Sequence, residues 1–180
     1  MPGMTSVDDS ARTEPSTLAG EREMLEGWLD YHRQTLALKC RGLDQAQLST
    51  ASAPPSNLTL LGLVRHMADV ERGWFRRIMA GERAERIYST PEDTDRAFRV
   101  TDADSPGETW EETHAVWQRE IEAARAVAAA HGLDEVGVGK HPSGEVFNLR
   151  WIYTHMIEEY ARHNGHADLL RERIDGATGD

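Results

Sequence analysis

The sequence contains a single cysteine, Cys40, which excludes an internal disulfide framework. It has no apolar run that approaches the roughly 18 residues of a membrane-spanning helix. Its first residues lack the basic and apolar regions of a signal peptide. Together these absences predict a soluble cytoplasmic protein.

Positive charge is also scarce, because 20 Lys and Arg residues face 31 Asp and Glu residues, for a net charge of −11. Nucleic-acid binding depends on basic side chains that release counterions from phosphates, so we do not expect it. A negatively charged membrane surface is disfavoured for the same reason. The sequence also has no GxSxG motif, no phosphate-binding glycine loop and no CxxC pair.

Four segments carry apolar residues at helical spacing, and we predict helices over 21–41, 59–79, 106–130 and 149–173. Thr59 is a candidate N-cap, and Gly42 and Gly81 are candidate stops. Ser105-Pro106-Gly107-Glu108 matches a capping box with proline at the first helical position, so the third helix is predicted to begin there.

Four helices of this length predict an all-α protein built as a four-helix bundle. Residues 1–17 are polar without periodicity and are predicted to be a disordered tail, which leaves one domain over 18–180. The connection 82–104 is long for a compact domain, so we predict a crossover between a second and a third helix that run in the same direction. With the loops 43–58 and 131–148, it is expected to shape a substrate cleft.

The last predicted helix has a stripe of Leu149, Ile152, Met156, Tyr160, Ala167 and Leu170. Glu159 and His163 interrupt this stripe four residues apart, so both side chains lie on one helix face. Burying unpaired polar groups is costly, and a shared metal ion would satisfy both. His66, beside the apolar face of 59–79, can supply a third ligand. Zinc accepts this set with a fourth position open, and nickel, manganese and ferrous iron accept it too.

Other polar and aromatic residues near these faces remain open alternatives. His155, His166 and His32 could also be ligands, but we interpret them as packing, supporting or surface residues. His114, His131 and His141 are interpreted as surface or cleft-rim residues. Cys40 is interpreted as a small buried residue rather than a reactive thiol. We expect a core position for Trp28, Trp74 and Trp151, and solvation for Asp69 and Glu71.

Two stretches carry a family resemblance: LLGLVRHMADVERGWFRRIMAGE (60–82) and LRWIYTHMIEEYARHNGHADLLRERIDG (149–176). They resemble the signature stretches of the DinB-like superfamily, in the actinobacterial branch of mycothiol-dependent S-transferases and maleylpyruvate isomerase. The likeness covers about 21–176. It implies an up-down-down-up four-helix bundle, a homodimer, and a divalent metal held by His66, Glu159 and His163.

The resemblance also implies an activity. Single-domain relatives resemble thiol S-transferases that use mycothiol in actinobacteria or bacillithiol in other Gram-positive bacteria. The isomerase carries a further C-terminal domain that we do not expect here, so isomerase activity is not expected. We expect a zinc-dependent enzyme, with nickel as a possible substitute. Through the bound metal, His66, Glu159 and His163 would activate mycothiol for attack on a small electrophile, in detoxification or stress.

Two other functions stay open at this point. The same site could use metal-bound water to hydrolyse a small amide or ester. Alternatively, the chain could be a non-catalytic DinB-like stress protein that binds a ligand or partner.

Overall fold

The computed structural model describes residues 12–100 and 107–179. Its α-helices are α1 (Glu21–Cys40), α2 (Gln45–Leu48), α3 (Leu60–Glu71), α4 (Trp110–Ala129) and α5 (Leu149–Asp175). A π-helix, η2 (Arg72–Met79), continues α3, and a 3-10 helix, η3 (Thr94–Phe98), lies in the following connection. Over these residues there are no β-strands, and β-type pairing is confined to isolated bridges such as that between Val136 and Asn148. The predicted all-α class is therefore confirmed.

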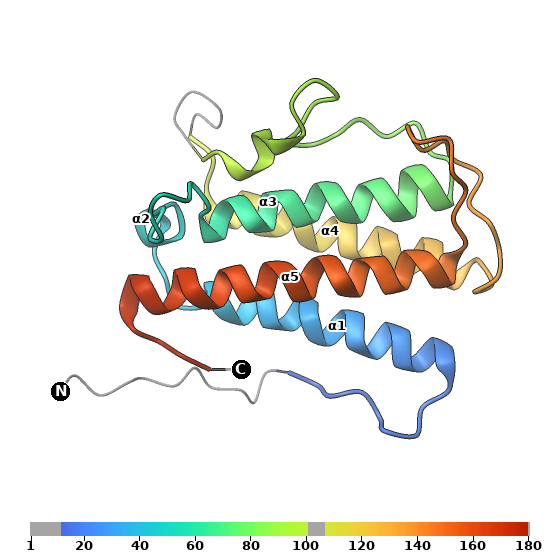
Figure 1. The fold of residues 1–180 in the computed structure, drawn as a ribbon, viewed down its shortest axis with the longest axis horizontal. Coiled ribbons are helices and arrows are strands. Elements are labelled where there is room, and N and C mark those ends of the chain that lie inside the picture. The colour runs from blue at the N-terminus through green and yellow to red at the C-terminus, as the bar shows by residue number, and fades with distance from the viewer. Residues whose placement is uncertain (1–11, 101–106, 180) are drawn as a thin grey trace.

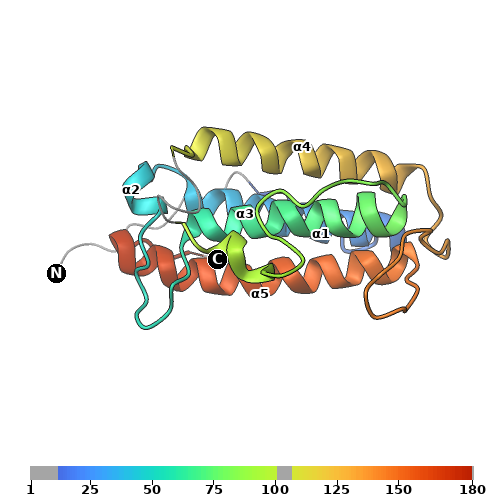
Figure 2. The same ribbon diagram turned by 90° about the horizontal axis from the view of Figure 1, so that it is seen from above.

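Four long helices, α1, α3, α4 and α5, lie side by side (Figures 1 and 2). Helix α1 packs mainly against α5, and α3 packs against both α4 and α5. The stripe predicted for the last helix is buried at all six positions, which are Leu149, Ile152, Met156, Tyr160, Ala167 and Leu170. Burial of each Leu, Ile or Met side chain of this stripe contributes about 1.5–3 kcal/mol, so this face fixes α5 against the core. Within the described residues, no helix has the length and apolar character needed to cross a membrane.

Helix α3 begins where the sequence predicts. The Thr59 side chain accepts a hydrogen bond from the Gly62 N–H at 2.9 Å and caps the helix. The next eight residues, predicted to continue the same helix, instead form η2, in which the Ala80 N–H donates to the Phe75 carbonyl five residues back. Gly81 follows with φ +67°, a backbone conformation that glycine adopts without steric cost.

The predicted start of the third helix is wrong. Helix α4 begins at Trp110, capped by Thr109 in a reciprocal capping box with Glu112. Ser105 and Pro106 lie outside the described residues. Glu108 is not an N3 residue, because it precedes the N-cap Thr109. Its carboxylate accepts a hydrogen bond from the Thr113 hydroxyl at 2.7 Å. Two consecutive matches to the capping-box motif occur in the sequence, at 105–108 and 109–112, and the second one caps the helix.

The connection after η2 is fastened to α3 by Asp69. Its carboxylate accepts hydrogen bonds from the backbone N–H groups of Ile87, Tyr88 and Ser89, at 2.7–3.2 Å. The expectation that Asp69 is solvated is therefore wrong, because three backbone donors need an acceptor there. Further along, η3 lies against α3, and the Phe98 carbonyl comes so close to Gly62 that a Cβ there would lie 2.5 Å from it.

Glu71 was also expected to be solvated, and this expectation is wrong. Its side chain is fully buried and accepts two hydrogen bonds from Arg33, at 2.8 and 2.7 Å. The Tyr160 hydroxyl donates a third at 2.7 Å, and it accepts one from Trp117 Nε1 at 2.8 Å. This polar network joins all four long helices in the middle of the core.

Two of the three tryptophans assigned to the core lie instead at the surface. Trp28 is 41% exposed and Trp151 is 43% exposed, whereas Trp74 is half-buried. Trp151 contacts Trp74 and Phe147, with ring centroids 5.1 and 4.4 Å away. These aromatic side chains pack on one another at the rim of the bundle, where helical spacing alone does not distinguish rim from core.

Candidate metal centre

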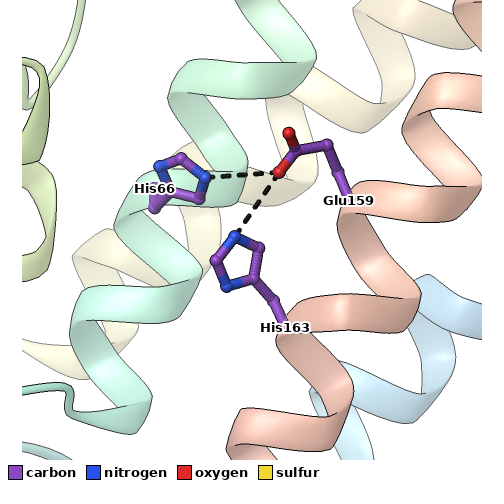
Figure 3. Close-up of side chains that lie close together, drawn as sticks. All are labelled: His66, Glu159 and His163. Atoms are coloured by element: carbon purple, nitrogen blue, oxygen red, sulfur yellow. Dashed lines mark ion pairs between the residues drawn. The ribbon is translucent and has the colours of Figure 1, made fainter.

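His66, Glu159 and His163 converge between α3 and α5 (Figure 3). His66 comes from α3, and Glu159 and His163 are one turn apart on α5. Glu159 Oε2 lies 3.7 Å from His66 Nε2 and 3.4 Å from His163 Nε2. The pairing of Glu159 with His163 follows from helix geometry, but the approach of His66 depends on the packing of α3 against α5.

The spacing of these atoms fits one small cation. All three ligand atoms lie within 4.8 Å of one another. Two ligand atoms that are each about 2.1 Å from a tetrahedral zinc ion lie roughly 3.4 Å apart. The two distances to Glu159 Oε2 are close to that value. Two imidazoles and a carboxylate are also a donor set that zinc accepts in catalytic sites.

An unsatisfied buried atom gives independent support for this fit. His66 Nε2 is buried and has no hydrogen-bond partner. It points at Glu159, but 3.7 Å is too long for a hydrogen bond (Figure 3). A buried nitrogen without a partner loses its hydration and gains nothing in return. A cation bound between these side chains would satisfy this nitrogen.

Glu159 is held in its ionised form. The interaction with His163, and then that with His66, keeps the pKa of this carboxyl well below its usual range, although partial burial acts in the opposite direction. An ionised carboxylate is the form that binds a divalent cation. The site therefore presents a negative oxygen between two imidazoles.

Neighbouring rings fix the two imidazoles. Phe98, from η3, stacks on His66 with ring centroids 4.3 Å apart. The Nδ1 atoms of His163 and His166 lie 3.3 Å apart, which leaves His163 Nε2 to face Glu159. A hydrogen bond at the second nitrogen is the usual way in which a ligating histidine is oriented. His166 thus supports His163, as the sequence interpretation proposed among its alternatives.

The remaining histidines lie around or away from this centre. His155 is the nearest, with Nε2 3.6 Å from Glu159 Oε1, and it forms a second cluster with Glu158 and Glu159. Glu158 is exposed and accepts hydrogen bonds from Arg162, so this cluster is more open than the first. His141 is half-buried and lines a cavity beside His66, in line with its interpretation as a surface or cleft-rim residue. His32, His114 and His131 are half-buried at other places.

Cys40 is buried, as expected. Burial raises the pKa of its thiol to about 12. A thiol in that state is not a nucleophile near neutral pH.

A cavity of about 220 Å³ opens beside His66. Its walls come from η2, from the 82–104 connection and from the loop before α5. Among the residues around this cavity, His66 was predicted as a ligand and His141 as a surface or cleft-rim residue, whereas Phe98, Arg77, Arg86 and Lys140 were not predicted to belong to the site. These residues reach the site because three segments that are distant in sequence meet there. The sequence predicted only that the connecting loops shape a cleft.

Comparison with known proteins identifies a matching protein family. A family model described as Mycothiol-S-transferase (MST) matches residues 24–176. The matched region includes α3 and α5 and all three residues of the candidate centre. It confirms the resemblance to a mycothiol S-transferase branch that the two sequence stretches carry. No curated protein matches the chain.

Proposed function

Because the chain belongs to the mycothiol-S-transferase family, we propose that it transfers a low-molecular-weight thiol, mycothiol, to a small electrophile with the help of a divalent metal ion. The observation that carries the metal dependence is the convergence of His66, Glu159 and His163 around a buried nitrogen that lacks a partner. The proposed physiological role is detoxification or stress response.

In this proposal His66, Glu159 and His163 hold the ion, with zinc preferred and nickel as an alternative. When bound, such an ion lowers the pKa of a thiol, so that the thiolate is available near neutral pH. The chain's own residues provide orientation. Phe98 and His166 fix the two imidazoles, and the cavity beside His66 holds the second reactant close to the thiol.

The transfer itself is a nucleophilic substitution or addition. The thiol sulfur forms a bond to an electrophilic carbon, and its proton passes to solvent. In a substitution, the carbon releases a leaving group such as halide together with the electron pair of the broken bond. In an addition to an activated alkene, the neighbouring carbon takes up a proton from solvent.

The first test is an assay of mycothiol with monobromobimane, on wild type and His163→Ala. We expect at least a tenfold loss of rate in the variant, because removing a metal ligand also removes the ion's effect on the thiol. His131→Ala, on a half-buried histidine at the end of α4, is the matched control and should keep the wild-type rate. Equal rates in wild type and His163→Ala would contradict the proposal.

Metal content supplies the second test. Elemental analysis of untagged protein should find about one ion per chain in wild type. The triple variant His66→Ala, Glu159→Ala, His163→Ala should contain none. Absence of metal from wild type, even after zinc is added, would favour a ligand-binding protein instead. Consumption of an ester with no consumption of thiol would favour the hydrolase.

We also propose several features on the basis of the family. The bundle is of the up-down-down-up type, which is supported by the colour gradients of the four long helices in Figure 1. The domain spans 18–180, after a tail over 1–17. The proposed quaternary state is a homodimer, and the proposed location is the cytoplasm. Sedimentation analysis and cell fractionation test the last two.

A further inference from the structure

The cavity beside His66 is lined by cations, against the overall charge of the chain. Arg77, Arg86 and Lys140 contribute to its walls, together with His66 and Asp69. The chain as a whole carries a net charge of −11. The carboxylate of Asp69 is occupied by three backbone N–H groups and by the Ser89 hydroxyl. The cavity therefore has an excess of positive charge next to the candidate metal centre.

None of these three cations forms an ion pair with an acidic side chain in the described residues. On the same helix, Arg72 and Arg76 both pair with Glu120. Arg77 and Lys140, in contrast, form no ion pair within residues 12–100 and 107–179. Arg86 donates to the Ser89 hydroxyl at 3.2 Å, which leaves its charge uncompensated. Several positive charges that line one cavity make its electrostatic potential positive, and such a cavity attracts anions.

Backbone hydrogen bonds hold the loop before α5 against η2 and so place Lys140 close to Arg77. The Gly139 N–H donates to the Ile78 carbonyl at 2.9 Å, and the Val138 N–H donates to the Met79 carbonyl at 3.2 Å. A Cβ on Gly139 would lie 1.9 Å from the Arg77 carbonyl oxygen, so only glycine permits this approach. The loop therefore docks on η2 with Lys140 next to the segment that carries Arg77. The stack of His141 on Trp74, with ring centroids 5.5 Å apart, adds a second attachment.

We propose that this cavity binds the carboxylate of an anionic electrophile and thereby selects the second substrate. The inference rests on the proposed thiol transfer and names the substrate class for it. His66 lines the cavity and also belongs to the candidate metal centre, so a carboxylate near Arg77 and Lys140 leaves the rest of a small substrate within reach of the thiol. Charge-assisted hydrogen bonds to Arg and Lys are the strongest that such a group can form.

A matched pair of electrophiles tests the charge requirement. 4-(Chloromethyl)benzoate and 4-(chloromethyl)benzamide carry the same reactive carbon, and only the first is an anion. In both, the mycothiol sulfur bonds to the benzylic carbon, chloride leaves with the electron pair of the C–Cl bond, and the thiol proton goes to solvent. We expect wild type to have a KM for the benzoate roughly tenfold below that for the benzamide.

The variant Arg77→Gln, Lys140→Gln should raise the KM for the benzoate roughly tenfold and leave the KM for the benzamide unchanged. Arg119→Gln, on an exposed residue of α4 outside the cavity, removes one positive charge as a matched control and should change neither. Equal KM values for the two electrophiles in wild type, or an unchanged preference in the double variant, would overturn the inference and leave the thiol transfer standing.

A binding measurement keeps the inference testable if no turnover is found. Trp74 lines the cavity, so saturable binding of benzoate should change the tryptophan fluorescence of wild type. The double variant should bind benzoate roughly tenfold more weakly, while benzamide should bind both proteins equally. Absence of turnover with benzoate binding intact would contradict the proposed transfer alone. Absence of saturable benzoate binding would overturn the anion site.

Discussion

Glu71 is the buried acid on which the central polar network depends, and its removal should be severely destabilising. The carboxylate is fully buried and accepts two hydrogen bonds from Arg33 and one from Tyr160. Burial by itself would lower the pKa of Arg33, but the charge and hydrogen bonds of Glu71 outweigh it and raise that pKa. In Glu71→Ala, Arg33 would keep only Asp30, a partly exposed partner at 2.8 Å.

Removing one partner of a buried ion pair costs about 3–5 kcal/mol, because the remaining charge stays buried without compensation. We therefore expect the free energy of unfolding of Glu71→Ala to fall by that amount. Urea unfolding at neutral pH, followed by tryptophan fluorescence and circular dichroism, measures it. Glu122→Ala removes an exposed partner of Arg125 on α4 and should change stability by about 0.5 kcal/mol or less.

The same substitution should also weaken the metal centre. Tyr160 follows Glu159 directly in α5, and Glu71 is in the same helix as His66, so the network fixes the two faces that form the site. Zinc affinity should fall in Glu71→Ala and stay unchanged in Glu122→Ala. A loss of less than about 1 kcal/mol in Glu71→Ala would refute this account, since an uncompensated buried guanidinium cannot cost so little.

Three further outcomes are expected. Zinc at a hundred times its Kd should raise the free energy of unfolding of wild type by about 2.7 kcal/mol, measured by calorimetry. His66→Ala should lose this stabilisation by zinc, and the control His114→Ala should keep it. Burial acts to raise the pKa of Glu120, but its ion pairs with η2 arginines outweigh this and lower it. Its stabilising contribution is thus complete above the unfolded-state pKa of about 4.3 and is lost as the pH falls below it. The stability difference between wild type and Glu120→Gln should therefore stay constant above about pH 5 and shrink in acid, and a difference that grows in acid would contradict the sign. Cys40 should react with a disulfide reagent only after unfolding, and rapid labelling of the folded protein would contradict its burial.

Most helix bounds and the buried face of α5 could be predicted, because they depend on apolar periodicity and capping residues within a few positions of one another. Helix α1 begins at the predicted residue and ends one residue before the predicted end, and α5 keeps its predicted start. The apolar stripe of α5 is buried as predicted. Periodicity and caps depend on neighbours within about four residues, so one sequence contains them.

The wrong predictions for Asp69 and Glu71 have a common cause, which is that their partners are distant in sequence. Asp69 and Glu71 look like ordinary charged positions on a helix. The donors that they accept from belong to the 82–104 connection and to Arg33 of α1. The change from α3 to η2 has no clear sequence signal either, because both helix types accept the same residues. Partners that are distant along the chain cannot be read from local spacing.

The sequence by itself determined the presence of the four long helical segments, but not the start of α4 or the change from α3 to η2. It also determined the pairing of Glu159 with His163, because a separation of four residues places two side chains on one helix face whatever the fold. Only the tertiary structure decided that His66 joins them, with its Nε2 3.7 Å from Glu159 Oε2, buried and without a hydrogen-bond partner. It also decided that Arg77 and Lys140 line the cavity beside His66. These distances depend on how whole helices and loops pack, which is set by the combined burial of the core.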